Sequence, residues 1–237
     1  MIERRLGGAR VGFTNRHGGV SLAPFDTLNL ARHVDDDPGA VDANHTIVAR
    51  ALGVRDAMWA LPHHVHGTAV LTVTDSTSDG ATGDGVATNQ TGILLGALGA
   101  DCAPIAIAND TACAAVHAGW RGAVNGVVEA GVAAVRSLGT GRVRAVVGPC
   151  VCAAHYEFGA ELLDELADRV GPEVRGQSAN GGPAFDLRGA LGAAFARAGV
   201  DEIEMLDICT LESADHFSYR RDGVTGRHGV VAILGDQ

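Results

Sequence analysis

Several short runs of the sequence are apolar at consecutive positions, and this feature constrains the fold more than any other. Ile93–Leu98 and Ala103–Ala108 contain no charged residue. A strand with one face in water alternates apolar and polar residues, whereas a strand covered on both faces does not. These runs therefore predict sheets that are covered on both faces. Further strands are predicted over Ala9–Thr14, Val70–Val73, Thr111–His117, Val143–Val147, Ile203–Leu206 and Gly229–Ile233.

Four segments carry apolar residues at helical spacing. In Pro38–Leu52, the proline suits a first turn, either of the two aspartates before it can act as the cap, and Gly53 ends the helix. The other helices are expected over Ala123–Leu138, Gly159–Val170 and Leu187–Ala198.

Helices and strands do not alternate strictly, and no Gly-x-Gly-x-x-Gly sequence follows a strand. The pattern therefore favours a layered α+β domain over a doubly wound one. We expect a single domain over residues 1–237, with Ser76–Gly85 as an exposed loop because of its composition.

The charged residues exclude several classes of protein. All 18 basic residues are arginine, so no lysine is present for a Schiff base or a phosphate-binding loop. The net charge is −10 at pH 7 without blocks of like charge, which argues against nucleic-acid or membrane binding.

The N-terminal residues lack the pattern of a secretory signal, and the most apolar tract, Gly92–Ala108, is interrupted by Asp101 and is too short for a membrane helix. We expect a cytoplasmic protein, and no obligate protein partner is evident.

Five cysteines, an odd number, favour buried, metal-bound or catalytic thiols over disulfides in such a chain. Two apolar runs flank Asn109-Asp110, which has the composition of a hairpin turn. If these two residues form the loop, Cys102 lies opposite His117 on one face, with Cβ atoms about 5 Å apart.

A thiol beside an imidazole suits two kinds of site. It can be a nucleophilic thiolate with a histidine base, or two ligands of a zinc ion. His64 and His66 would share one face of an extended segment, and either can supply a third ligand. Three protein ligands leave the fourth position open, as in catalytic zinc sites.

The segment Cys150–Glu157 also combines cysteines with a histidine. The zinc deaminases place His-x-Glu before Pro-Cys-x-x-Cys, whereas here the order is reversed and the cysteine spacing is one residue short. We therefore expect no deaminase-type site there.

Three motifs, His64-Val65-His66-Gly67, Ala100-Asp101-Cys102 and Val116–Gly122, resemble the signature motifs of the YfiH-like laccase-domain family, once called polyphenol oxidoreductases. The resemblance covers essentially the whole chain. It extends through Thr14–Ser21, Leu28–Leu30, Val34–Pro38, Val147–Cys150, Cys209-Thr210 and Ser218–Gly223. His64 is a departure, since relatives usually carry glutamine there, and the Val-His-Gly context favours His66 as the ligand.

The resemblance implies an α+β fold of the YfiH/cytotoxic-necrotizing-factor-like kind, with two mixed β-sheets flanked by helices. It implies a catalytic zinc site made by His66, Cys102 and His117. It also implies purine nucleoside phosphorylase activity on adenosine, inosine, guanosine and methylthioadenosine, with adenosine deaminase activity in the same site. Two alternatives stay open: a Cys-His amide hydrolase that edits cell-wall precursors, and a copper-dependent polyphenol oxidase. Copper oxidases usually require several histidine clusters, and the remaining histidines here are scattered.

Phosphorolysis requires a phosphate anchor, for which a lysine-free chain can use arginine. Arg121, four residues after His117, is the first candidate, with Arg16 and Arg221 behind it. Asp101 is expected to act as a general acid or base, or to orient a ligand histidine. The expected partners are small molecules, a purine nucleoside and phosphate.

Overall fold

The computed structural model describes residues 1–55, 58–74, 80–200 and 202–235. One sheet has five strands, which lie side by side in the order β1, β2, β13, β6, β3. Their bounds are β1 (Ile2–Leu6), β2 (Ala9–Phe13), β13 (His228–Leu234), β6 (Ile93–Gly99) and β3 (Met58–Ala60). The strand β3 is parallel to β6, and the other pairs are antiparallel.

The other large sheet has six strands in the order β12, β9, β7, β8, β5, β4. Their bounds are β12 (Glu202–Met205), β9 (Arg144–Val147), β7 (Ala103–Ala108), β8 (Cys113–Ala118), β5 (Gly85–Thr88) and β4 (Val70–Thr72). Two pairs, β12 with β9 and β4 with β5, are parallel, so this sheet is mixed as well. A separate two-stranded sheet consists of β10 (Arg175–Gln177) and β11 (Pro183–Phe185).

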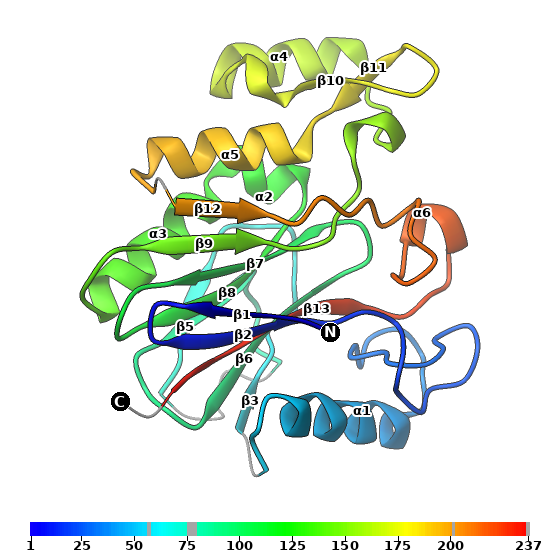
Figure 1. Ribbon diagram of the computed structural model, residues 1–237. Helices are drawn as coiled ribbons and strands as arrows, with labels where there is room; N and C mark the ends of the chain where they lie inside the picture. Colours follow the sequence, from blue (N-terminus) through cyan, green and yellow to red (C-terminus); the bar gives the residue numbers. More distant parts are fainter. Residues whose placement is uncertain (56–57, 75–79, 201, 236–237) are drawn as a thin grey trace.

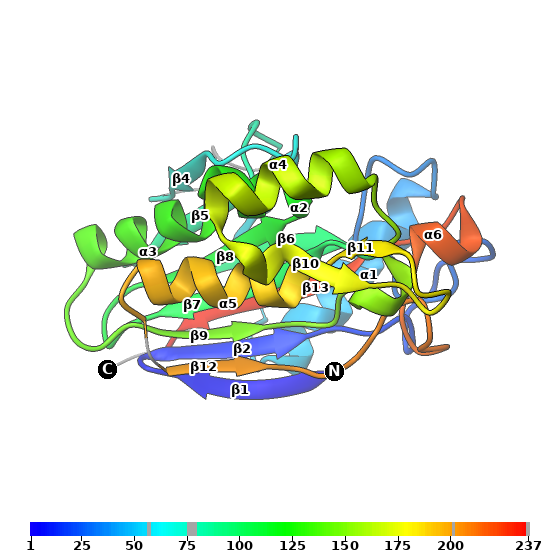
Figure 2. The ribbon, with the colours of Figure 1, turned by 90° about the horizontal axis from the view of Figure 1, so that it is seen from above.

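The helices cover the outer faces of the stacked sheets. They are α1 (Pro38–Ala51), α2 (Trp120–Asn125), α3 (Val127–Leu138), α4 (Ala160–Val170), α5 (Leu187–Arg197) and the short α6 (Tyr219–Asp222), with the single turns η2 (Ala153–His155) and η3 (Pro172–Val174). In Figure 1, α1 lies below the five-stranded sheet, α2 and α5 lie above the six-stranded sheet with α4 beyond them, and α3 lies at the left. Figure 2 shows α3, α4 and α5 over the six-stranded sheet from above. This arrangement confirms the predicted α+β fold with two mixed sheets flanked by helices.

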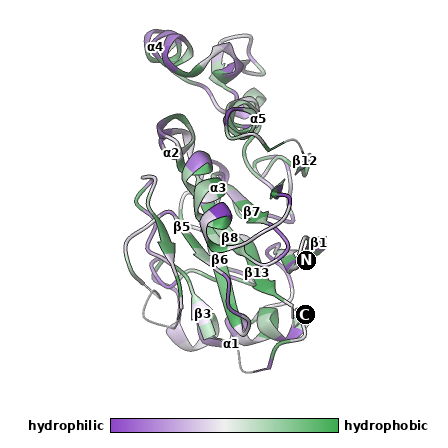
Figure 3. Cartoon of the chain, turned by 90° about the vertical axis from the view of Figure 1, so that its left-hand side faces the viewer, coloured by the Kyte–Doolittle hydropathy of each residue, from purple (hydrophilic) through white to green (hydrophobic). Residues whose placement is uncertain are grey.

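Three apolar layers hold these elements together. One lies between α1 and the five-stranded sheet, one between the two sheets, and one between the six-stranded sheet and its helices. Every residue of β6, β7, β8 and β13 is buried, which explains why these runs are apolar at consecutive positions. Figure 3 shows hydrophobic residues along the strands between the helical layers. The layer between the sheets contains many small side chains, among them Ala60, Ala97, Ala106, Ala108, Ala115 and Ala232.

The structure differs from the sequence predictions in several elements. The helix expected over Ala123–Leu138 begins earlier, at Trp120, and is divided into α2 and α3 at Gly126, whose φ is +101°. The predicted loop Ser76–Gly85 lies partly outside the described residues, since 75–79 are among those not described. Its last residue begins β5. The sequence pattern did not predict the strands β1, β3, β5, β10 and β11. Within the described ranges, no helix is long and apolar enough to cross a membrane.

The pairing of β7 with β8 differs from the predicted register. Pro104, not Cys102, is the partner of His117. A shift of the turn by one residue moves each partner by two, and this keeps the side chains on the same face of the sheet. Cys102 and His117 are therefore diagonal neighbours, still within reach of each other.

Asn109 determines the position of this turn. Its Oδ1 accepts hydrogen bonds from the backbone N–H groups of Thr111 and Ala112, at 3.0 and 2.7 Å. Its own N–H donates to the carbonyl of Ala112, at 2.9 Å. An asparagine that bonds to the backbone two residues on stabilises a turn at those residues. The two-residue loop is therefore Asp110-Thr111 instead of Asn109-Asp110.

Candidate active site

Three potential ligands from three segments of the chain meet where the two sheets adjoin. His66 follows β3, Cys102 lies in the connection from β6 to β7, and His117 is on β8. Their ligand atoms all lie within 4.8 Å of one another. Since β3 and β6 belong to the five-stranded sheet and β7 and β8 to the six-stranded one, the segments that carry the group connect to both sheets. The structure thus brings together the three residues of the predicted zinc site.

A buried carboxylate, Asp84, joins two of these residues. Its Oδ1 accepts hydrogen bonds from the backbone N–H of His66, at 2.8 Å, and from Nδ1 of His117, at 3.0 Å. Its Oδ2 accepts a third from the N–H of Gly67, at 2.6 Å. Because Nδ1 of His117 donates to Asp84, the lone pair of Nε2 is available for a metal or a proton.

Asp101 has a different environment from the one predicted for a group that orients a ligand histidine. Its Oδ1 accepts a hydrogen bond from Oγ1 of Thr210, at 2.7 Å, and its Oδ2 accepts one from the N–H of Arg220, at 2.8 Å. The carboxylate that bonds to a ring nitrogen of His117 is Asp84. The sequence did not indicate this, because Asp84 lies between two glycines in a stretch with the composition of an exposed loop.

The backbone is unusual on both sides of the group. His66 and Asp101 have φ values of +58° and +105°, in the region that favours glycine. Such conformations cluster at functional sites.

The ligand atoms lie close to the backbone of Gly119: a Cβ there would lie 2.8 Å from Nδ1 of His66 and 2.9 Å from Sγ of Cys102. A side chain at this position would fill the space beside the ligand atoms.

Burial and charge act in opposite directions on Cys102 and His117. Burial alone would raise the pKa of Cys102, but the positive charge of His117 and hydrogen bonds from His117 and His66 lower it to about 6. Burial alone would lower the pKa of His117, but the Cys102 thiolate and the hydrogen bond to Asp84 raise it to about 9. Without a metal, the pair at neutral pH is therefore a thiolate beside an imidazolium. A thiolate is the form that acts as a nucleophile or a metal ligand.

The group opens into a pocket of about 320 Å³, which is within the usual size range of small-molecule sites. The pocket is lined by His33, His63, His64, His66, Leu98, Gly99, Ala100, Cys102, His117, Tyr219 and Arg227. Arg227 is an addition to the sequence-based candidates, although it follows closely on the Ser218–Gly223 motif. Its Nη1 donates to the carbonyls of Thr225 and Gly226, at 2.6 and 3.0 Å.

His64 lies beside the three ligands without joining them. Its ring stacks on that of His117, with centroids 4.5 Å apart and planes at 10°. Burial lowers the pKa of His64 well below its usual value, so the ring is neutral. In the described part of the chain, the buried Nε2 of His64 has no hydrogen-bond partner.

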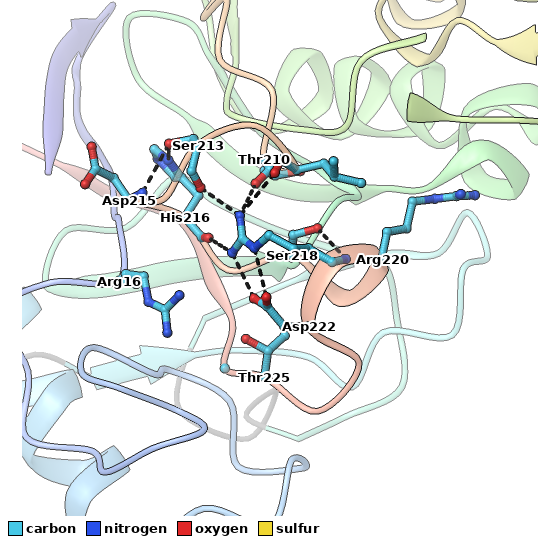
Figure 4. A network of polar contacts seen from close by, with 12 residues as sticks. Arg16, Thr210, Ser213, Asp215, His216, Ser218, Arg220, Asp222 and Thr225 are labelled. Carbon is cyan, nitrogen blue, oxygen red and sulfur yellow. Dashed lines mark hydrogen bonds and ion pairs between the residues drawn. The ribbon is translucent and has the colours of Figure 1, made fainter. Parts of the chain in front are cut away.

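The guanidinium of Arg221, a predicted phosphate anchor, makes hydrogen bonds to other groups of the protein. It donates to the carbonyls of Thr210, Leu211, Ser213 and His216 and to the carboxylate of Asp222, at 2.8 to 3.3 Å. Figure 4 shows these contacts. The arginine therefore holds the loop between β12 and α6 in shape.

The other two predicted anchors also lie outside the pocket lining. Arg16 donates to the carbonyl and carboxylate of Asp26, at 2.9 and 3.2 Å, and its guanidinium lies 4.9 Å from the ring centroid of Phe217. Arg121 is exposed at the start of α2 and lies over the ring of Trp120, 4.5 Å from its centroid. Of the arginines discussed, Arg227 is the one that lines the pocket.

Comparisons with known proteins support the family resemblance. Residues 10–235 match the model of the family described as multi-copper polyphenol oxidoreductase laccase. A Streptomyces coelicolor protein named purine nucleoside phosphorylase is 43% identical over 235 residues, which are 96% of this chain and 97% of that protein. A Shigella flexneri protein named purine nucleoside phosphorylase YfiH is 33% identical over 220 residues, 90% of this chain and 89% of that protein.

The fold agrees with these sequence relationships. The crystal structure of YlmD from Geobacillus stearothermophilus superimposes with a TM-score of 0.87 and 31% identity, over 98% of this chain and 93% of that one. The match to the family model extends over nearly all of the two sheets and their helices. The chain therefore belongs to the multi-copper polyphenol oxidoreductase laccase family, which includes the YfiH-like proteins.

Proposed function

We propose that this protein is a zinc-dependent purine nucleoside phosphorylase that also deaminates adenosine. The observation that carries the proposal is the group of His66, Cys102 and His117, supported by Asp84 and open to a pocket that Arg227 lines. Relatives named purine nucleoside phosphorylases support the reaction class. The proposed substrates are phosphate and adenosine, inosine, guanosine or methylthioadenosine. We propose that residues 1–237 form one catalytic domain that acts on these metabolites in the cytoplasm.

The three side chains fit a catalytic zinc ion. A thiolate and two imidazoles are common zinc ligands, and three protein ligands leave one position for substrate. The space that a Cβ at Gly119 would fill lies against two of them. Asp84 behind His117 is the usual kind of support for a zinc-binding histidine.

Copper is the alternative metal for the same ligands. A polyphenol oxidase with several coppers requires additional histidine groups. Among the described residues, the other group that could hold a metal contains a single histidine. The donor set therefore favours zinc over the chemistry that the family's older description suggests.

The chemistry that zinc would supply here is Lewis acidity, which activates water or polarises a substrate oxygen. In phosphorolysis, a phosphate oxygen bonds to the ribose C1′ as the bond from C1′ to the base breaks, and the base leaves with the electron pair and takes up a proton. Arg227 would hold the phosphate, because no described carboxylate lies within ion-pair distance of its guanidinium. Buried polar atoms normally have a partner, so Nε2 of His64 would bond to the substrate.

One observation favours an amide hydrolase as the second candidate. Cys102, His117 and Asp84 have the connectivity of a nucleophile, a base and an orienting carboxylate. In this reaction Cys102 would attack the amide carbon, His117 would give a proton to the leaving amine, and water would then cleave the thioester to release the carboxylic acid and restore the thiol. Such a site does not require His66, which is why the zinc enzyme is preferred.

Two measurements test the proposal. Inosine or adenosine incubated with enzyme and phosphate should yield the free base and ribose 1-phosphate on chromatography, and adenosine alone should yield inosine. Elemental analysis should show that Cys102→Ala loses one zinc per chain relative to the unmodified protein. No base release from adenosine, inosine, guanosine or methylthioadenosine would favour the amide hydrolase. Several coppers per chain would favour the oxidase.

A further inference from the structure

A second group of metal-ligating side chains lies outside the pocket lining. It consists of Cys152, His155, Cys209 and Glu212, whose ligand atoms all lie within 4.8 Å of one another. Each of two segments contributes a pair of ligands three residues apart. In one pair, Cys152 directly precedes the turn η2 and His155 is its last residue, and the other pair lies in the loop between β12 and α6. Neither pair belongs to the site described above.

Backbone contacts hold these two segments together independently of any ion. Cys150 and Cys209 form a parallel bridge. The N–H of Cys150 donates to the carbonyl of Ile208, at 3.3 Å, and the N–H of Thr210 donates to the carbonyl of Cys150, at 3.2 Å. The turn η2 then brings His155 back toward Cys152, since the N–H of His155 donates to the carbonyl of Cys152, at 3.1 Å. The positions of the four side chains therefore follow from the fold.

The side chains already contact one another in pairs. The N–H of Cys152 donates to Sγ of Cys209, at 3.3 Å, and Nε2 of His155 lies 2.8 Å from Oε1 of Glu212. An N–H donor to sulfur stabilises a thiolate, as in protein metal–thiolate centres. Cys209 is buried, whereas the side chain of Glu212 is 61% exposed. An ion can therefore enter from the solvent side and reach the sulfur atoms.

We propose that Cys152, His155, Cys209 and Glu212 form a second metal site that binds zinc in a structural role. Two thiolates, an imidazole and a carboxylate complete a tetrahedral set without an open position, which is the arrangement of structural zinc. Ligand atoms in such a site are about 3.3 to 3.8 Å apart, given bond lengths of about 2.0 to 2.3 Å. The observed limit of 4.8 Å thus requires movements of about one ångström toward the ion, which the exposed Glu212 and the partly buried Cys152 and His155 can make around the buried Cys209.

The sequence pattern of Cys150–Glu157 did not indicate this ligand set. The pattern contains His-x-Glu, which in the zinc deaminases supplies a ligand and the glutamate that acts as the general acid or base. The structure places Glu157 elsewhere, where it accepts a hydrogen bond from Asn180 at 3.4 Å. Cys209 lies 57 residues from Cys152 in the sequence, so the spacing typical of local metal motifs is absent.

The second site has a structural connection to the first. Thr210, next to Cys209, donates through Oγ1 to Oδ1 of Asp101, at 2.7 Å, and Asp101 precedes Cys102. An ion bound to Cys209 and Glu212 would hold the loop on which this hydrogen bond depends. Loss of the second ion is therefore expected to loosen this loop while the ligands of the first site remain in place.

Elemental analysis of the whole chain tests the proposal. The protein loaded with zinc and freed of excess by gel filtration should hold about two zinc ions per chain, one at each set of ligands. Cys152→Ser and Glu212→Gln should each lose one ion and keep the other. Glu157→Gln is the matched control, since Glu157 is exposed on the same segment, and it should keep both ions. Cys102→Ala should also keep the second ion, so failure of the first site and failure of this proposal are distinguishable.

Cobalt substitution of the unmodified protein avoids the effect of substitutions on folding. Two thiolates at the second site and one at the first should give thiolate-to-cobalt absorption of about twice the intensity per ion at the second site. The absorption of the second site should persist in Cys102→Ala. One metal ion per chain, lost in Cys102→Ala and retained in Cys152→Ser, would overturn the proposal. A disulfide between Cys152 and Cys209 in freshly purified protein that takes up one zinc would overturn it as well.

Discussion

Asp84 and His117 are joined by a hydrogen bond of 3.0 Å between Oδ1 and Nδ1, and both side chains are almost entirely shielded from solvent. The same carboxylate also accepts hydrogen bonds from the backbone at His66 and Gly67. One acidic group thus fixes the orientation of His117 and the backbone position of His66.

Replacement of Asp84 by asparagine should therefore weaken the metal site. An amide is neutral and accepts hydrogen bonds less strongly, so we expect zinc affinity and kcat/KM to fall by about 10- to 100-fold. Competition with a chelator measures the affinity. Asp168→Asn, on the exposed face of α4, is the control and should change neither quantity. Unchanged zinc affinity in a folded Asp84→Asn protein would contradict the assigned role.

Gly119→Ala should also impair the site. The new Cβ would lie less than 3 Å from Nδ1 of His66 and Sγ of Cys102, so the two ligands would have to move apart. We expect a loss of zinc affinity of about 10-fold or more, as for other changes that displace the supports of metal ligands. Gly159→Ala is the control, because a Cβ there has no neighbour within 4 Å. Isothermal titration of both variants with zinc gives the comparison.

Arg227→Gln should raise the KM for phosphate. A hydrogen bond between charged groups contributes about 1.5 to 3 kcal/mol, so its loss predicts a rise of about 10- to 100-fold. The KM for the nucleoside should change much less, because the guanidinium is assigned to the phosphate. Arg121→Gln tests the earlier candidate in the same assay. A phosphate KM that rises in Arg121→Gln and not in Arg227→Gln would reverse the assignment.

Alkylation of Cys102 separates a zinc ligand from a free nucleophile. In metal-free protein the lowered pKa keeps the thiol as thiolate above pH 6, so the labelling rate should rise with pH to a midpoint near pH 6. Ordinary cysteines have a pKa of about 8.5. Zinc should slow the labelling, because it engages the sulfur lone pairs.

Two other cysteines serve as controls within the same sample. Burial raises the pKa of Cys113 to about 12 and that of Cys150 to about 11, so both should stay unlabelled at neutral pH. Mass spectrometry of peptides distinguishes the sites. Rapid labelling of Cys102 in zinc-loaded protein, with a proportional loss of activity, would favour the amide hydrolase.

Arg221→Ala should affect stability more than substrate affinity. It leaves the carbonyls of Ser213 and His216 without their donor, which costs about 2 kcal/mol. For a domain of this size we expect Tm to fall by about 4 to 8 °C. Arg55→Ala, at an exposed position, is the control for loss of an arginine. Thermal melts of both, with the phosphate KM as a second readout, check the expectation.

The fold could be predicted where local chemistry decides it. Asp37 caps α1 and Pro38 begins it, as the sequence indicated. The break at Gly126 could not be predicted, because glycine is compatible with both a helix interior and the left-handed conformation it adopts here. The strand β1 was missed because charged residues occupy its centre, as an edge strand permits.

The site could be predicted in part for a similar reason. A two-residue turn at Asn109-Asp110 predicts Cys102 and His117 on one face of the hairpin. The actual turn is one residue further along, and this shift leaves both side chains on the same face of the sheet. Asp84 was missed because its burial depends on β5 and on the segment around His66, which are remote in the sequence from Cys102 and His117. Arg227 and Arg221 differ by six positions, and tertiary packing alone decides which of them lines the pocket.

The small side chains between the two sheets have a consequence for how this protein can change in evolution. Alanines such as Ala106 and Ala115 allow the sheets to lie close together. Cys102 lies in the connection that crosses from β6 of one sheet to β7 of the other, so the thickness of this layer constrains the path of the backbone that carries its sulfur. A larger aliphatic residue in the layer would alter coordination geometry without touching a ligand. The geometry of the proposed metal site therefore places a size limit on these buried alanines as well as on the ligands themselves.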